Sequence, residues 1–184
     1  MNLPNAITIA RILAVPLMIW LIVSGEYMAA FWVFVLAGIS DAVDGFIAKR
    51  FNQRTELGAY LDPAADKLML VSIYVCLGLL RVLPPWLVIL VVTRDTLIIG
   101  AIALATLLDQ PVHIRPLLLS KLNTVAQIML AGLVLAILGF DIANRQIVLL
   151  GSIIVAILTL ASGTQYVLAW IRRMASNPQP PQKG

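Results

Sequence analysis

The sequence contains few charged residues, and it has only one cysteine and one histidine. Charged residues make up 12% of its 184 positions and hydrophobic residues 61%, and the mean hydropathy is +0.97. Globular domains carry about 25% charged residues. The composition is instead typical of helical proteins that cross a membrane several times.

The rare reactive residues give little indication of chemistry. Cys76 lies in an apolar run and has no second cysteine to pair with, so no disulfide can form within the chain, and nothing indicates an oxidising compartment. His113 lies in a loop beside Pro111, and we interpret it as a solvated side chain rather than a ligand. The sequence also contains no internal repeat and no sign of a second domain.

Long apolar stretches fill most of the chain, and each is close to the roughly 20 residues that a helix needs to cross a bilayer. The first is longer than the hydrophobic region of a signal peptide and lacks a clear small-residue cleavage site, so we interpret it as a retained span. We expect an all-α polytopic membrane protein with one transmembrane domain (1–174) and a disordered, proline-rich tail (175–184). The six predicted transmembrane helices are about 5–24, 28–49, 57–81, 85–108, 116–139 and 146–171.

The distribution of lysine and arginine predicts the orientation. An even number of spans puts both termini on one side, together with eight of the basic residues, and leaves only Arg81 and Arg145 on the other. Basic loops stay in the cytoplasm, so both termini are predicted to be cytoplasmic. The eight residues are Lys49, Arg50, Arg54, Arg115, Lys121, Arg172, Arg173 and Lys183.

Four aspartates lie at the predicted cytoplasmic ends of the second and third spans, in "SDAVDGFIAKRFNQRTELGAYLDPAADK" (40–67). On helices, Asp41 and Asp44 share one face, and so do Asp62 and Asp66. If the two spans are antiparallel neighbours, the four carboxylates converge, and they then need cations between them. Oxygen ligands favour Mg²⁺, Mn²⁺ or Ca²⁺, and paired divalent ions serve phosphoryl chemistry. The alternative is a set of helix-end charges at the membrane interface.

Small and basic residues accompany the aspartates. Gly45 and Gly58 allow a helix or a bulky substrate to approach the backbone closely. Lys49 and Arg50 are placed to meet a phosphate held by the metals.

The whole stretch resembles the signature of the CDP-alcohol phosphatidyltransferases. Its pattern is Asp-x2-Asp-Gly-x2-Ala-Lys-x8-Gly-x3-Asp-x3-Asp, and it departs from the family only at Lys49, where arginine is usual. Lysine keeps the charge but lacks the bidentate fork of arginine. "NLPNAITIAR" at the start also looks like the first span of bacterial phosphatidylglycerophosphate and cardiolipin synthases.

The resemblance implies a six-helix, usually dimeric enzyme whose active site opens to the cytoplasmic half of a bilayer, here a bacterial inner membrane. An acceptor hydroxyl would attack the β-phosphorus of CDP-diacylglycerol, and CMP would leave. The implied partners are CDP-diacylglycerol, the acceptor, membrane lipids and a second copy of the chain, without nucleic acid. On matching positions, two Mg²⁺ or Mn²⁺ ions would be held by Asp41, Asp44, Asp62 and Asp66. Asp66 would also be the general base, and the cytidine diphosphate would be bordered by Gly45, Ala48, Lys49 and Gly58.

Three basic residues of the later spans are candidates for binding the acceptor's phosphate: Arg94, Arg115 and Lys121. Alternatively, Arg94 pairs with Asp95 within the span, and the other two anchor the protein to lipid headgroups. The acceptor is phosphatidylglycerol or glycerol 3-phosphate, and both carry a phosphate. Arg-Asp followed by Ser-Lys-x-Asn-Thr-x-x-Gln looks like the CMP-forming cardiolipin synthases, which favours phosphatidylglycerol.

Other interpretations of the same residues remain open. Asn5, Thr8 and Arg11 share one face of the first span, where they either reach the nucleotide or cap and anchor the helix. An intramembrane prenyltransferase also uses aspartate clusters, and a transporter can hold buried acids. Release of CMP distinguishes the phosphatidyltransferase from both.

Overall fold

The computed structural model describes the backbone of residues 3–51, 56–107, 118–142 and 144–176, and the side chains of 10–41, 43, 67–100, 118–142, 144–166 and 168. Over these residues the chain is helical, without strands, which confirms the all-α prediction. The predicted bounds of the first five helices are met within two residues, and the last helix continues beyond 171. The helices are α1 (Leu3–Val23), α2 (Tyr27–Phe51), α3 (Glu56–Leu79), α4 (Pro85–Leu107), α5 (Leu118–Gly139) and α6 (Arg145–Ser176).

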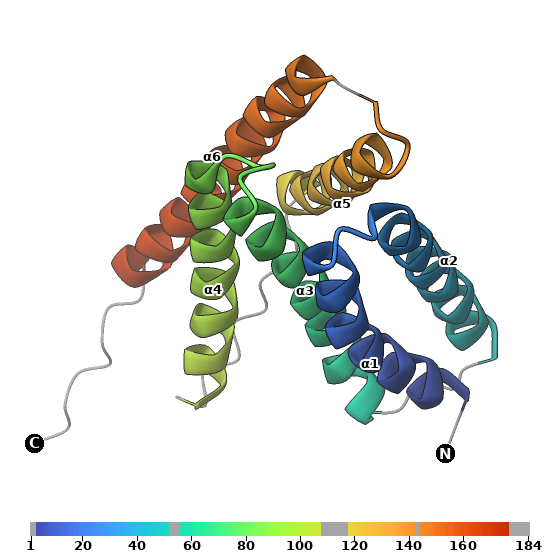
Figure 1. Cartoon of the computed structure of the whole chain (residues 1–184). Coiled ribbons are helices and arrows are strands. Elements are labelled where there is room, and N and C mark those ends of the chain that lie inside the picture. The colour runs from blue at the N-terminus through green and yellow to red at the C-terminus, as the bar shows by residue number, and fades with distance from the viewer. Residues whose placement is uncertain (1–2, 52–55, 108–117, 143, 177–184) are drawn as a thin grey trace, which may run out of the picture.

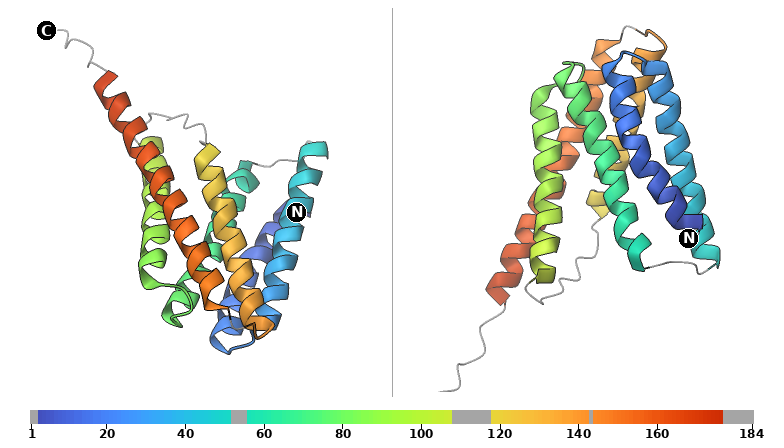
Figure 2. Two further views of the ribbon diagram at one scale, coloured as in Figure 1. Left: turned by 90° about the horizontal axis from the view of Figure 1, so that it is seen from above. Right: turned by 60° about the horizontal axis from the view of Figure 1, so that its bottom comes forward.

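The helices run up and down, so that the two ends of the bundle gather alternate helix termini (Figures 1 and 2). α3 contacts α1, α4 and α5, while α5 also contacts α2 and α6. One end of the bundle collects the start of α1, the end of α2 and the start of α3 (Figure 2, right). The helices spread apart towards this end and come together at the opposite one (Figure 2, left).

The second and third helices are not direct neighbours, which was the condition under which the sequence predicted that the four carboxylates converge. Over the residues with described contacts, α2 and α3 do not touch, and α1 contacts both. The reason is that Met18 and Ile22 of α1 are fully buried in the same apolar cluster as Ile73 of α3, so α1 occupies the face of α3 that α2 would need. The aspartates of α2 and α3 therefore share an end of the bundle without the two helices being in contact over this part.

Apolar side chains fill the interior and also cover much of the outside. Buried residues such as Tyr74, Leu87 and Val134 belong to one core cluster. Large apolar side chains are exposed on the outer faces, among them Met129 at 69%. Within the described part of the chain, two helical segments are long and apolar enough to cross a bilayer, namely Leu118–Gly139 and Arg145–Tyr166.

At the end of the bundle where the helices come together, the packing of α5 against α2 depends on a glycine. A Cβ on Gly139, the last residue of α5, would lie 3.0 Å from the Cα and 3.1 Å from the backbone nitrogen of Met28 in α2. Backbone atoms cannot rotate away as a flexible side chain can, so one helix would have to shift. The absence of a side chain at Gly139 thus lets α5 and α2 meet at this end.

We expect Gly139→Ala to destabilise the protein by about 1–3 kcal/mol, because the added methyl group separates α5 from α2. The measurement is thermal unfolding of the purified protein in detergent. Gly38→Ala in α2 is the matched control, since a Cβ there meets nothing within 4 Å. The control should be neutral or gain up to about 1 kcal/mol of helix propensity. Equal unfolding temperatures for the two variants would contradict the proposed close contact.

Candidate functional site

The four aspartates of the sequence motif lie on two helices, Asp41 and Asp44 on α2 and Asp62 and Asp66 on α3. The side chain of Asp41 is described, while those of the other three lie outside the described part. The same holds for the four predicted neighbours of the nucleotide: Gly45, Ala48, Lys49 and Gly58.

Asp41 forms an ion pair with α1. Its Oδ1 lies 2.8 Å from Nη1 of Arg11, whose side chain is only 4% exposed, against 45% for that of Asp41. The guanidinium is buried where α1 and α2 meet, and the carboxylate extends from it towards the surface. This pair fixes the position of one aspartate of the motif and offsets part of the negative charge that the motif concentrates.

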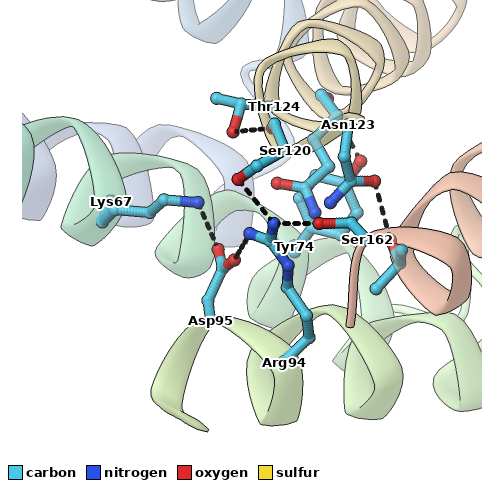
Figure 3. A network of polar contacts seen from close by, with 10 residues as sticks. Lys67, Tyr74, Arg94, Asp95, Ser120, Asn123, Thr124 and Ser162 are labelled. Atoms are coloured by element: carbon cyan, nitrogen blue, oxygen red, sulfur yellow. Dashed lines mark hydrogen bonds and ion pairs between the residues drawn. The ribbon is translucent and has the colours of Figure 1, made fainter. Parts of the chain in front are cut away.

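A second and more deeply buried carboxylate belongs to α4. Asp95 is 3% exposed and has a cation on each oxygen: Nζ of Lys67 in α3 donates to Oδ2 at 2.6 Å, and Nη1 of Arg94 donates to Oδ1 at 2.8 Å (Figure 3). A buried carboxylate is stable when cations and hydrogen bonds replace its hydration. Asp95 therefore joins α3 to α4.

Arg94 extends the network to the last two helices. Its Nη2 donates to Oγ of Ser120 in α5 at 2.7 Å and also to Oγ of Ser162 in α6 (Figure 3). The guanidinium also lies over the ring of Tyr166, with Cζ 5.8 Å from the centroid, which is within the range of a cation–π contact. Four helices thus meet at one guanidinium and one carboxylate.

More polar groups lie between α3, α5 and α6. Thr159 donates to Oδ1 of Asn123 at 2.9 Å, and the hydroxyl of Tyr74 donates to the carbonyl oxygen of Gln127 at 3.1 Å. Several buried atoms have no partner among the described residues: Arg94 Nε, Asn123 Nδ2 and both side-chain polar atoms of Gln127. Buried polar atoms are nearly always hydrogen-bonded, so these atoms leave hydrogen-bonding capacity unused between the helices.

Of the three predicted acceptor residues, only Arg94 has described side-chain contacts. The pair of Arg94 with Asp95, which the sequence left as an alternative, is present. Lys121 is exposed and belongs to no described ion pair, and Arg115 lies outside the described residues, as does His113. Their binding of a phosphate stays a prediction.

Beyond their pairing with each other, the partners of Arg94 and Asp95 were missed from the sequence, namely Lys67, Ser120 and Ser162. A lysine within a span is costly enough to demand a partner, so Lys67 carried a usable signal. Ser120, Asn123 and Gln127 recur at intervals of three and four residues along α5, which marks one polar stripe on an otherwise apolar helix. Ser162 had no comparable signal.

The donor chemistry of the motif suits divalent metal ions. Carboxylate oxygens are the ligands that Mg²⁺ and Mn²⁺ prefer, and both motif helices place their aspartate-bearing ends at the same end of the bundle (Figure 2). Within the described part of the chain, no three histidine, cysteine, aspartate or glutamate side chains are close enough to hold a metal ion. Three of the four predicted ligands lie outside that part.

Known proteins resemble the chain over nearly its whole length. The sequence profile of the CDP-alcohol phosphatidyltransferases matches residues 1–171. A cardiolipin synthase (CMP-forming) / mitochondrial hydrolase fusion protein of Schizosaccharomyces pombe is 32% identical over 91% of this chain and 31% of its own length. The human cardiolipin synthase (CMP-forming) is 31% identical over 90% of this chain and 60% of its own.

A relative named for a different reaction is similar to the same degree. The chloroplastic CDP-diacylglycerol–glycerol-3-phosphate 3-phosphatidyltransferase 1 of Oryza sativa subsp. japonica is 35% identical over 90% of this chain and 56% of its own length. The chain spans between about a third and three fifths of the length of these three relatives.

Replacing Asp95 by asparagine tests the central ion pair. Asp95→Asn keeps the shape of the side chain but leaves Lys67 and Arg94 without their carboxylate, so we expect a loss of about 3–5 kcal/mol in unfolding free energy. Thermal or denaturant unfolding in detergent measures it. Glu26→Gln is the control, because Glu26 is exposed and has no described ion pair, and its effect should stay within about 0.5 kcal/mol. An equally small effect of both changes would mean that the network does not hold the helices together.

Proposed function

This chain belongs to the CDP-alcohol phosphatidyltransferase family, and on that premise we propose that it transfers a phosphatidyl group from CDP-diacylglycerol to an acceptor hydroxyl and releases CMP. The observation that carries the proposal is the aspartate motif, which lies within the matched residues 1–171. α2 ends and α3 begins on the side where the helices spread apart, so both halves of the motif lie at one end of the bundle (Figure 2).

We propose that all six helices cross a bilayer. The exposed apolar side chains support this, because a surface of this kind is stable against lipid and costly in water. The excess of basic residues on the side of the termini supports a cytoplasmic active site, and the resemblance to bacterial synthases supports the bacterial inner membrane. The transmembrane domain at 1–174, the disordered tail and the homodimer remain predictions.

The aspartates Asp41, Asp44, Asp62 and Asp66 are proposed to hold two Mg²⁺ or Mn²⁺ ions. When bound, the ions would supply positive charge that neutralises the diphosphate and stabilises the departing CMP. Arg11 supports this assignment because it anchors the carboxylate of Asp41 to α1 at 2.8 Å. A ligand that is already held by a buried cation loses little conformational freedom when a metal binds.

The chain's own residues then position the substrates and move one proton. The acceptor hydroxyl attacks the β-phosphorus of CDP-diacylglycerol, and the bond from this phosphorus to the bridging oxygen breaks. Asp66 is proposed to accept the proton of the hydroxyl. The residues Gly45, Ala48, Lys49 and Gly58 are proposed to border the cytidine diphosphate, with Lys49 contributing charge where the family usually has arginine. Phosphoryl transfer needs little beyond this positioning and charge compensation.

We propose phosphatidylglycerol as the acceptor, which makes the product cardiolipin, and glycerol 3-phosphate as the alternative. Arg94, Arg115 and Lys121 are the proposed phosphate ligands. Asp95, Ser120 and Ser162 fix the guanidinium of Arg94, and its Nε lacks a partner among the described residues. An oriented guanidinium with a free N–H is suited to a phosphate oxygen. Similar identities to relatives named for either acceptor leave the choice to experiment.

Asp66→Asn tests the proton acceptor. We expect the turnover rate to fall about 10²–10⁴-fold, which is the usual contribution of a general base, while CDP-diacylglycerol still binds. Single-turnover release of CMP measures the rate, and titration with a fluorescent CDP-lipid measures binding. Turnover close to that of the unaltered protein would assign the proton to another group. Loss of lipid binding together with turnover would give Asp66 a role as a metal ligand alone.

The acceptor assay tests the proposed function as a whole. Purified protein is supplied with CDP-diacylglycerol and one acceptor at a time, and the lipid product is identified by mass spectrometry. We expect CMP release and cardiolipin with phosphatidylglycerol, a poor reaction with glycerol 3-phosphate, and no activity in EDTA until Mg²⁺ or Mn²⁺ is restored. Phosphatidylglycerophosphate as the main product would change the acceptor and keep the mechanism. Release of inorganic diphosphate from a prenyl donor, or transport without CMP, would instead favour the prenyltransferase or the transporter.

A further inference from the structure

A cavity is lined by residues of the α3–α4 turn, the end of α5 and the start of α6. These segments lie at the end of the bundle opposite the aspartate motif (Figure 2, right). Its volume is about 480 Å³, which is in the range of small-molecule sites. The polar and charged lining residues are Tyr27, Arg81, Asp141, Asn144 and Arg145, and the remaining lining is aliphatic. Nothing in the proposed transfer reaction uses this cavity.

The two arginines are the residues that the charge distribution left unexplained. Arg81 and Arg145 are the only basic residues predicted for the side facing away from the cytoplasm, and a side of this kind is normally poor in them. They are 64 positions apart in the sequence, at 81 and 145, yet both line this cavity. Each is exposed, and neither is engaged in a described hydrogen bond or ion pair through its side chain. With Asp141 as the acidic residue of the lining, the cavity carries one net positive charge.

The backbone at the cavity is held in an unusual conformation. α3 and α5 both end in a turn in which a non-glycine residue has positive φ, Arg81 at 57° and Asp141 at 54°. At Arg81 the turn is closed by hydrogen bonds from the backbone N–H of Arg81 to Gly78 and from that of Val82 to Leu77, at 3.0 and 2.9 Å. Glycine is the residue that adopts this conformation without cost.

α1 provides an internal comparison. It ends in the same kind of turn, but the residue with positive φ is Gly25, at 79°, and Gly25 does not line the cavity. Non-glycine residues in this conformation cost of order 1 kcal/mol each. The chain therefore uses glycine where the turn is only structural, and it has strained charged residues at the two turns that line the cavity.

Additional donors face the same space. α6 begins at Arg145, and the first N–H groups of a helix have no partner within it and favour anions. Asn144 caps this helix by accepting from the N–H of Ile147 at 3.2 Å. Tyr27, which is half-buried, adds a hydroxyl. Two guanidinium groups, a hydroxyl and a helix N-terminus are together a donor set that matches the oxygens of a phosphate.

We propose that this cavity binds a phosphate group through Arg81 and Arg145, either in the headgroup of an anionic phospholipid or in a soluble phosphate compound. The aliphatic part of the lining, which includes Ile137 and Val148, can accept the glycerol and first acyl carbons of a lipid. Asp141 opposes the anion and limits its affinity, so that the site releases its ligand readily.

The test compares three probes on the purified protein in detergent: inorganic phosphate, dihexanoyl-phosphatidylglycerol, and dihexanoylglycerol, which lacks the phosphate. Native mass spectrometry counts the bound lipids, and ³¹P NMR follows phosphate. The variant is Arg81→Gly with Arg145→Gln. Glycine relieves the strained turn, and removing a cation from a helix N-terminus is favourable, so this variant should fold at least as stably as the unaltered protein.

We expect the double variant to bind at least one of the phosphate-bearing probes about tenfold more weakly or worse at this site, as for loss of hydrogen bonds to a charged group. Loss confined to the phospholipid identifies a lipid site, and loss confined to inorganic phosphate identifies a soluble ligand. Asp141→Gly, which also relieves its turn, should bind the same probe more tightly. Unchanged binding of both phosphate-bearing probes by the double variant, or an equal loss of dihexanoylglycerol, would overturn the proposal. The double variant leaves the transfer site unaltered, so phospholipid bound there is counted equally in both proteins and the difference between them is independent of the transfer activity.

Discussion

Burying a carboxylate among apolar helices costs several kcal/mol unless cations and hydrogen bonds replace the lost water, and Asp95 is buried to 3% exposure in this bundle. The requirement to neutralise it determines which helices come together. Lys67 meets it from α3 and Arg94 from α4, and Arg94 in turn needs the hydroxyls of Ser120 and Ser162. A change in any of these helix positions would leave a charge without its partner.

Ion pairs also position the helices that carry the aspartate motif. Asp41 ties α2 to α1 through Arg11, and Lys67, the residue after Asp66, ties α3 to α4 through Asp95. Because α1 contacts both α2 and α3, the two motif helices are placed relative to each other through a third one. Chemistry that needs four carboxylates at defined positions would depend on these supporting pairs as much as on the motif itself.

The helices were predictable from the sequence because a span needs a long apolar segment, and interruptions by proline, glycine and charge mark its limits. The sequence did not predict which helices pack against one another. The apolar residues of α1 and α2 lie on several faces and do not indicate which face packs inward, so the sequence did not place α1 between α2 and α3. The Arg94–Asp95 pair was foreseeable as adjacent opposite charges. Lys67 and Ser162 come from segments 28 and 68 positions from their partners, and the pattern of a single sequence does not encode such distances. The motif aspartates were singled out by their spacing and by the family resemblance that it carries, and their role stays a prediction.

The contact of Gly139 with the backbone of Met28 has a mechanical consequence, because it lies at the narrow end of a bundle whose helices diverge (Figure 2). α5 has 22 residues, so it extends roughly 33 Å from this contact at 1.5 Å per residue. A tilt of α5 by about 5° about the Gly139 contact would move the opposite end of this helix sideways by roughly 3 Å, given its length. That displacement is comparable to the length of a hydrogen bond. A methyl-sized change in the spacing of α5 and α2 at Gly139 would therefore produce a larger displacement at the opposite end of α5.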